Sequence, residues 1–127
     1  GGLAREAGLS SSTGSMEGPA GGELAAGSAI VELGRIRATS GGKQSADIII
    51  SLSFPYDEND LPWSEELQAN KHRFRESVSS YFAGLEIRDL KKLDDDQLRQ
   101  GLMKRFNEKL LLGRISQLWI HEYMVVE

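Results

Sequence analysis

The stretch Ile115-Ser-Gln-Leu-Trp-Ile-His-Glu-Tyr-Met-Val-Val126 decides how this chain folds, and it is typical of a β-strand that closes a domain. Apolar residues occupy both of its parities: Leu118, Ile120, Met124 and Val126 on one, and Trp119, Tyr123 and Val125 on the other. Successive side chains of a strand point to opposite faces, so a strand that is apolar on both parities is covered twice. A chain this short cannot easily cover both faces itself, so the stretch predicts contact with another molecule.

Two further strands are predicted upstream, over residues 30–38 and 47–54. Gly34 lies inside the first, where it permits a bulge or close packing. Residues 39–45 contain Gly41-Gly42 and predict a hairpin turn. Ile48, Ile50, Leu52 and Phe54 share one face of the second strand, and Ile49, Ser51 and Ser53 share the other. We expect one core face and one small, semi-polar face, with Pro55 ending the strand before an acidic loop over 56–62.

Helical periodicity follows in two segments separated by a connector over residues 86–93. The first helix is predicted to begin at Ser64, a good N-cap residue, and to end at Gly84. The second is predicted to begin at Asp94, which has the spacing of a capping box with Gln97. The order β-β-α-α-β predicts an α+β domain in which two helices cover one face of a three-stranded antiparallel or mixed sheet.

Composition places the folded domain in residues 30–127 and limits the classes of function. Residues 1–29 hold eight of the fourteen glycines, so they predict a flexible linker or a segment derived from an expression vector. The net charge is −4 and the basic residues are dispersed, which argues against a nucleic-acid interface. The chain has no cysteine, and no apolar run approaches the about 18–20 residues of a membrane span.

The residues that suggest chemistry have simpler explanations, and we expect no catalytic, metal or cofactor site. The acidic run 57–60 lacks the glycine and the later glutamate of a calcium loop, and the run 94–96 is explained by helix capping. His72 and His121 belong to no metal-ligand spacing, and neither has an evident acid–base partner. Gly41-Gly42-Lys43 leads into a strand instead of a helix, so it is a turn and no phosphate loop.

Aromatic residues of the last strand suggest an interface. Trp119 and Tyr123 are suited to a core and to a protein contact, and the sequence leaves both readings open. His121 lies on the same parity, where a packed or a partner-facing role is plausible. Ser51 and Ser53 join them if they share the outer face of the sheet. These five residues are the candidate partner-binding set.

Four segments within residues 30–126 carry the pattern of a known family. They are His72-Arg-Phe-Arg-Glu-Ser-Val-Ser-Ser-Tyr-Phe82, Glu86-Ile-Arg-Asp-Leu-Lys-Lys-Leu93, the helix over 97–110, and Gly113-Arg-Ile-Ser-Gln-Leu-Trp-Ile-His-Glu-Tyr-Met-Val-Val126. Asp89-Leu90 matches the family's connector, and Phe106-Asn107 matches its "iN" pair with Phe in place of Ile. With these segments the chain resembles the flagellar basal-body protein FliL.

This resemblance implies a non-enzymatic role in motility. Members of the family hold a stomatin/prohibitin-like domain on the periplasmic side of the bacterial inner membrane, anchored by one N-terminal helix. The domain forms a ring or arc with copies of itself around the stator proteins and recruits or stabilises them. The chain departs from the family in lacking that helix, which suggests a truncated ectodomain. The alternatives are a stomatin-like membrane-organising scaffold without a flagellar role and a small ligand-binding domain.

Overall fold

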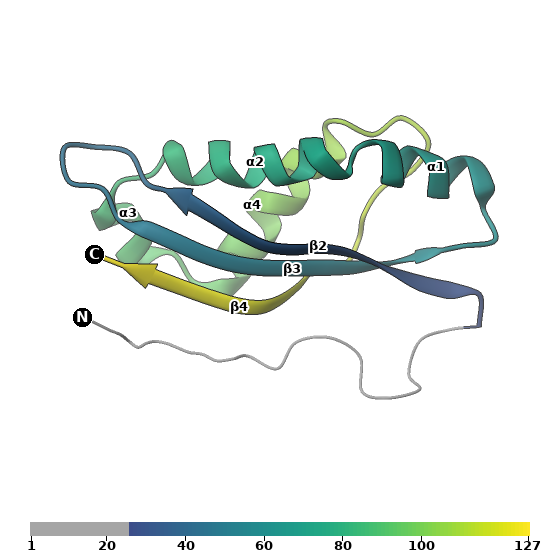
Figure 1. Cartoon of the computed structure of the whole chain (residues 1–127), viewed down its shortest axis with the longest axis horizontal. Coiled ribbons are helices and arrows are strands. Elements are labelled where there is room, and N and C mark those ends of the chain that lie inside the picture. The colour runs from purple at the N-terminus through teal and green to yellow at the C-terminus, as the bar shows by residue number, and fades with distance from the viewer. Residues whose placement is uncertain (1–25) are drawn as a thin grey trace.

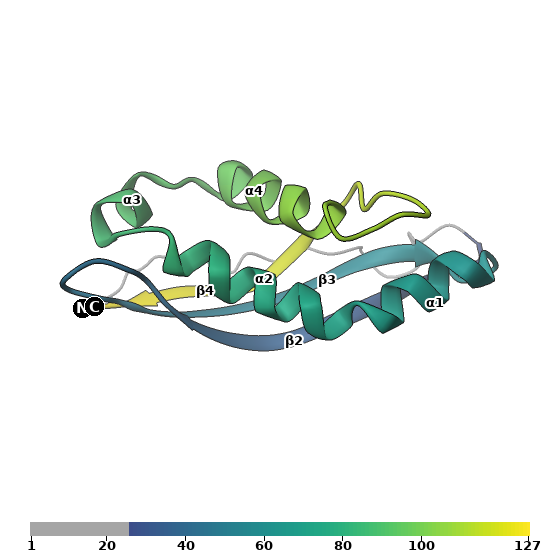
Figure 2. The ribbon, with the colours of Figure 1, turned by 90° about the horizontal axis from the view of Figure 1, so that it is seen from above.

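The computed structural model describes residues 26–127, which form an α+β domain with one three-stranded sheet. Its elements in chain order are β2 (Ser28–Thr39), β3 (Asp47–Asp57), α1 (Leu61–Ala69), α2 (Lys71–Ala83), α3 (Ile87–Lys92), α4 (Asp95–Asn107) and β4 (Trp119–Val126). The strands lie in the order β2-β3-β4 and both pairings are antiparallel. The helices gather on one face of this twisted sheet (Figures 1 and 2). The predicted fold class is confirmed.

The β2–β3 hairpin has a bulge at Gly34, which is one of the two roles that the sequence allowed this glycine. The register between the two strands shifts between Glu32 and Gly34, and Gly34 has a φ of 75°. Only glycine adopts this left-handed conformation without steric cost, so the bulge is placed at the residue that tolerates it. At the turn, the N–H of Ser40 donates to the carbonyl of Ala46 at 2.9 Å, and the N–H of Ala46 donates to the Ser40 hydroxyl at 2.8 Å. The N–H of Gly41 donates to the carbonyl of Leu85 at 2.7 Å. The turn is thereby attached to the end of α2.

Pro55 does not end β3, as the sequence had suggested, because the strand continues to Asp57. Pro55 pairs with Ile30 of β2, while the pairing of β3 with β4 extends only to Ser53. Proline lacks a backbone donor and is tolerated where one side of a strand has no neighbour. The position of Pro55 is therefore an edge position within a strand that is central elsewhere.

The helical region differs from the prediction in three places. The first helix begins at Leu61, because the side chain of Asp60 accepts a hydrogen bond from the N–H of Trp63 at 3.2 Å, so the N-cap is Asp60 instead of Ser64. A break at Asn70, whose side chain donates to the carbonyl of Glu66 at 2.9 Å, divides the predicted helix into α1 and α2. The predicted connector contains the short helix α3.

The capping box predicted for the last helix is confirmed. The carboxylate of Asp94 accepts from the N–H of Gln97 at 2.8 Å, and the Gln97 side chain accepts from the N–H of Asp94 at 3.1 Å. Helix α3 begins with an equivalent reciprocal pair, Glu86 and Asp89. Each box satisfies two N-terminal donors that the helix itself leaves unpaired.

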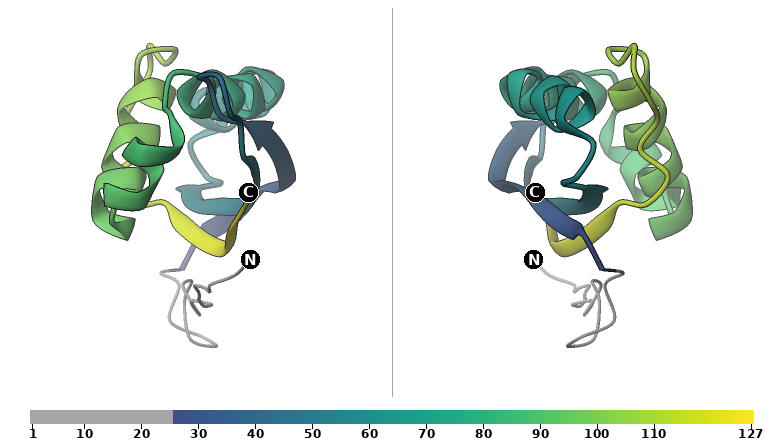
Figure 3. Two further views of the ribbon diagram at one scale, coloured as in Figure 1. Left: turned by 90° about the vertical axis from the view of Figure 1, so that its left-hand side faces the viewer. Right: turned by 90° about the vertical axis from the view of Figure 1, so that its right-hand side faces the viewer.

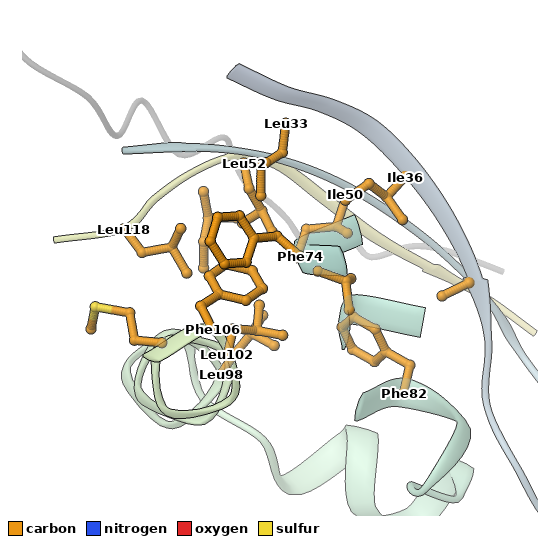
Figure 4. Packing of buried hydrophobic residues seen from close by; sticks show 14 of the residues in the cluster. Leu33, Ile36, Ile50, Leu52, Phe74, Phe82, Leu98, Leu102, Phe106 and Leu118 are labelled. Carbon is orange, nitrogen blue, oxygen red and sulfur yellow. The ribbon is translucent and has the colours of Figure 1, made fainter. Parts of the chain in front are cut away.

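The core lies between the helices and the sheet, as Figure 4 shows. Phe74 of α2 is fully buried at its centre, with ring centroids 5.9 Å from Phe54 and 4.9 Å from Phe106. Tyr81 lies where α2 meets α4, with its ring 5.5 Å from the Arg105 guanidinium. Burial raises the pKa of Tyr81 and the charge of Arg105 opposes this shift. The buried residues of β3, α2 and α4 are thus one continuous cluster.

Candidate functional site

A bulge in β4 explains why this strand is apolar on both parities. Ser51 of β3 is opposite Glu122, whereas the next residue, Leu52, is opposite Ile120. His121 is therefore an extra residue between two paired ones, which is the definition of a β-bulge. One extra residue reverses the parity of everything that follows it. Residues of both parities therefore reach the core, and the contact of a second molecule with the other face of β4 stays a prediction.

The two halves of β4 therefore use opposite parities to reach the core. Before the bulge, Ile120 is 4% exposed. After it, Tyr123 and Val125 pack against the core, while Met124 and Val126 are 40% and 44% exposed. We call the face of the sheet that points away from the helices the outer face (Figure 3). Register and exposure assign to it Ile30, Glu32, Arg35, Arg37, Asp47, Ile49, Ser51, Ser53, Trp119, His121, Glu122, Met124 and Val126.

Tyr123 is separated from the rest of the candidate partner-binding set. Its ring stacks on Phe82 of α2, with centroids 6.2 Å apart and an interplanar angle of 20°. It also lies opposite Ile50, a fully buried residue of β3. Tyr123 thus points toward the helices. Its parity in the sequence had placed it on the same face as Trp119, and the bulge is the reason that the two residues lie on opposite faces.

The other four candidates share the outer face. Trp119 pairs with Ser53 across β3 and β4, and Ser53 is buried although it lies on this face. The bulge directs His121 over Ser53, so that its Nε2 and the serine Oγ are hydrogen-bonding partners. Ser51 lies two residues before Ser53 and its hydroxyl donates to the Glu122 carboxylate at 3.3 Å.

Arg35 completes a polar strip that crosses all three strands. Its Nη2 lies 3.2 Å from Oε2 of Glu122, so a side chain of β2 reaches a side chain of β4 over the intervening Ser51 of β3. We define the polar strip as Arg35, Ser51, Glu122, Ser53 and His121. Exposed apolar residues lie at both ends of it, with Ile30 at one end of the sheet and Met124 and Val126 at the other.

Sequence reasoning missed Arg35 and Glu122. The alternation of Arg35 and Arg37 with buried Ile36 and Ala38 places both arginines on one face of β2. Glu122 has the parity of Ile120, which the sequence alone assigns to a common face. The bulge alone places Glu122 and Ile120 on opposite faces, so no pattern within the strand predicts the ion pair with Arg35.

The acidic and histidine candidates considered for other chemistry have local structural partners. Asp60 and Asp94 cap helices, and Asp57 accepts a hydrogen bond from the N–H of Asn59 at 2.9 Å. His72 is exposed on α2, with its Nε2 3.4 Å from the Glu76 carboxylate. Within residues 26–127, no three His, Cys, Asp or Glu side chains converge in a way that suits a metal ion.

An open depression lies between the β2–β3 turn and α3. Its lining includes Lys43, Glu86, Arg88 and Lys91, and Arg88 pairs with Glu86 at 3.7 Å. Neither His72 nor His121 lines it. Charged side chains that already interact with one another in solvent indicate a solvated surface, so the outer face is the better candidate for function.

No protein-family model matches the chain, and a search of curated proteins finds no match. Among residues 26–127, none of the helices is both long enough and apolar enough to cross a membrane.

Proposed function

We propose that the domain is a non-enzymatic scaffold of the bacterial flagellar motor, related to FliL. In this proposal it lies on the periplasmic side of the inner membrane and is anchored by a helix that precedes the present chain. Copies of the domain assemble in a ring or arc around the stator proteins and recruit or stabilise them. The observation that carries the proposal is the outer face, where a polar strip is flanked by exposed apolar side chains.

The positions that carry the resemblance support the proposal because each has a definite task in the fold. Asp89 closes the capping box of α3, and Leu90, which is 6% exposed, attaches that helix to the core. Phe106 is fully buried, and the Asn107 side chain forms two hydrogen bonds with the backbone of Ile115. When the residues of a motif stabilise the fold, a match to that motif indicates a common architecture. It carries no information about partners by itself.

The composition of the outer face supports protein contact over catalysis. Interfaces combine apolar and aromatic residues with a polar surround, and the outer face offers Trp119, Ile30, Met124 and Val126 around the polar strip. Single exposed apolar residues are ordinary on any protein. Several of them on one face of a sheet, opposite the face that the helices occupy, favour an interaction surface.

The test uses the full-length membrane-anchored protein in motile cells. An Ile30→Glu/Trp119→Glu pair places two charges on the outer face, and we expect swimming speed and fluorescent-stator occupancy to fall several-fold. Leu112→Glu is the matched control, because Leu112 is 60% exposed and lies in the loop between α4 and β4, outside this face. Normal speed and occupancy in the double variant, with an unchanged thermal melt, would contradict the proposal.

The second candidate function is a stomatin-like scaffold that organises membranes without a flagellar role. The same outer face serves it, since the face specifies a contact and leaves the partner open. A tagged full-length protein separates the two functions. Foci that coincide with flagellar motors are expected from the first, and an even distribution over the membrane is expected from the second.

A further inference from the structure

The edge of β2 that faces away from β3 is protected in its middle by a side chain. The guanidinium of Arg75 on α2 donates to the carbonyl of Leu33 and, at 3.2 Å, to the carbonyl of Arg35. Unpaired carbonyl and N–H groups on an edge strand are a template for another strand, and natural proteins often block them with charged side chains. Arg75 therefore closes the middle of β2 to strand addition. Its two hydrogen bonds do not cover the start of the strand, residues 28–32.

The backbone of residues 28–32 directs alternate hydrogen-bonding groups away from β3, the one strand of residues 26–127 that pairs with β2. The carbonyl of Gly27 accepts from the N–H of Glu58 at 2.9 Å, so Gly27 bonds toward the β3 side. In an antiparallel ladder such residues alternate with residues whose N–H and C=O point away from that neighbour. Ile30 lies opposite Pro55, which has no N–H to offer it, and this agrees with an outward direction at Ile30. The outward-directed residues are therefore Ser28, Ile30 and Glu32.

We propose that residues 28–32 pair antiparallel with residues 28–32 of a second copy of this chain, about a twofold axis through Ile30. Directly opposite residues in an antiparallel pair share a face, so outer-face residues must meet outer-face residues. Ile30 and Glu32 lie on the outer face, whereas Val31 is buried toward the helices. Centring the pair on Ile30 satisfies this rule, and it gives the outward backbone groups of the whole segment a partner.

On the outer face, this register joins apolar side chains of the two copies into one row. Ile30 is 36% exposed in the single chain, and Pro55 of β3 lies directly beside it. Across the axis the row contains Pro55, Ile30 and then the same two residues of the second copy in reverse order. The two Ile30 side chains cover one another, and removal of their apolar surface from water stabilises the contact.

The remaining pairs of this register are also compatible with a second copy. Ala29 lies beside Val31 of the second copy on the side that faces the helices, so a small apolar side chain meets a larger one. Ser28 lies beside Glu32 of the second copy, so a hydroxyl donor meets a carboxylate and like charges are not directly opposite one another. The segment is thus complementary to itself, which favours a second copy over an unrelated strand.

The same geometry limits the size and the strength of the assembly. A contact in which one segment meets itself about a twofold axis is used up in the dimer. Arg75 occupies the carbonyl of Leu33, so the pairing ends at Glu32. The pairing is short, so the buried area is small and the dimer is weak, with a dissociation constant on the order of 100 μM. The inference does not rest on the flagellar proposal, since it concerns backbone groups at the edge of the sheet.

The absence of cysteine from the sequence allows a direct test of the register. In the 127-residue chain, Ile30→Cys places the two thiols on the axis, with about 5.5 Å between Cα atoms, which suits a disulfide. Ser28→Cys and Glu32→Cys are the matched controls on the same strand. The two copies of either control position lie about 14 Å apart in this register, too far for a disulfide. We expect mild oxidation to convert Ile30→Cys to a covalent dimer at least about tenfold faster than either control.

A mixture of the two control variants tests the register a second time. Position 28 of one copy lies opposite position 32 of the other, so Ser28→Cys and Glu32→Cys chains are expected to form a mixed disulfide when they are oxidised together. Each chain oxidised alone is expected to stay largely monomeric. A register shifted by two residues would instead crosslink position 30 with position 28 or position 32.

Sedimentation equilibrium of the unmodified chain supplies an independent measurement. We expect the average mass to rise from monomer toward dimer as the concentration passes through the hundreds of micromolar, and to go no further. Ile30→Pro removes an N–H that bonds only to the second copy, and Ile30→Lys places two ammonium groups together on the axis. Each is expected to weaken the dimer at least tenfold. Leu111→Lys is the matched control, since Leu111 is 91% exposed in the loop between α4 and β4, and it is expected to leave the dimer unchanged.

Thermal melts of the same variants separate a lost dimer from a lost fold. Ile30→Lys alone decides the comparison if Ile30→Pro lowers the thermal midpoint. Preferential crosslinking at position 30, a mixed 28–32 disulfide and a mass that saturates at the dimer support the proposal. A chain that stays monomeric at these concentrations, equal or faster crosslinking of either control, or equal sensitivity to Leu111→Lys overturns it. None of these results depends on motility, so a failed edge pairing and a failed flagellar role are distinguishable.

Discussion

The side chain of Asn107 forms two hydrogen bonds with the backbone of Ile115, eight residues later in the chain. Its Oδ1 accepts from the Ile115 N–H at 2.7 Å and its Nδ2 donates to the Ile115 carbonyl at 3.0 Å. The carboxamide thus replaces a neighbouring strand and satisfies both backbone groups of a residue that is 5% exposed. This pair attaches the segment between α4 and β4 to the end of α4.

Asn107→Ala is therefore expected to destabilise the domain by about 1–3 kcal/mol, because both backbone groups of Ile115 lose their partner in a nearly dry site. Asn107→Asp is the matched control. It keeps the acceptor for the Ile115 N–H and loses the donor for the carbonyl, so we expect an intermediate cost. Urea unfolding monitored by tryptophan fluorescence measures both variants. Equal stability of Asn107→Ala and the parent chain would show that water replaces the clamp.

Gly41, in the β2–β3 turn, and Gly84, after α2, differ in the space that is available for a side chain. A Cβ on Gly41 would lie 2.5 Å from the backbone oxygen of Ala83, whereas the nearest atom to a Cβ on Gly84 is 3.6 Å away. Backbone cannot rotate aside as a side chain can, so Gly41→Ala is expected to cost about 2 kcal/mol or more and to loosen the β2–β3 turn. Gly84→Ala, in a helical conformation with φ of −84°, is expected to be neutral or stabilising by about 0.5 kcal/mol.

The comparison is read from the thermal midpoints of the two variants. Similar melting temperatures for Gly41→Ala and Gly84→Ala would contradict this expectation. They would mean that the turn moves away from α2 with little loss of folding free energy. Amide hydrogen exchange at Gly41 and Ala46 then distinguishes a displaced turn from a rigid one, since both hydrogen-bond near this turn.

The fold class followed from the sequence because hydrophobic period and turn residues agree with each other over most of the chain. The alternation in 47–54, the glycine at the β2 bulge and the Asp94 capping box each depend on neighbours within a few residues, and each was predicted. Elements set by tertiary contacts were not. The end of β3 depends on its pairing with β2 as far as Asp57, which the local pattern does not contain. The break at Asn70 has a local hydrogen bond to Glu66, but the apolar period that runs through both helices conceals it.

At the candidate site, one residue that the local sequence pattern does not identify decides which side chains face outward. His121 has no property that marks it as the extra residue of a bulge, yet it decides which of Tyr123 and Met124 faces the core. Counting parity through the bulge placed Tyr123 with Trp119 and Met124 with Ile120, whereas the structure has each pair on opposite faces. The four outer-face candidates were found because they lie before the bulge, within it or on β3. Arg35 and Glu122 were missed because their contact requires the registers of two strand pairs.

The ion pair between Arg35 and Glu122 is expected to contribute little to stability. Their side chains are 64% and 36% exposed, so solvent screens the attraction. A double-mutant cycle of Arg35→Ala and Glu122→Ala is expected to give a coupling free energy of about 0.5 kcal/mol, which falls toward zero in about 1 M salt. A coupling several times larger, or one insensitive to salt, would contradict the solvated pair that we describe. A weak pair is a useful property of an interaction face, since a partner can replace it at low cost.

The side chain of Arg75 both attaches α2 to β2 and blocks two carbonyls on the edge of β2. Arg75→Ala leaves the carbonyls of Leu33 and Arg35 without their donors, and we expect a loss of about 1–2 kcal/mol in unfolding free energy. It also exposes these two carbonyls on the edge of β2 as a template for strand addition, so self-association is expected to increase in sedimentation at high concentration. Arg73→Ala, at an exposed position on the same helix, is the matched control and should change neither quantity. Destabilisation without increased self-association would limit Arg75 to a role in the fold, because edge protection predicts both effects from the same two hydrogen bonds.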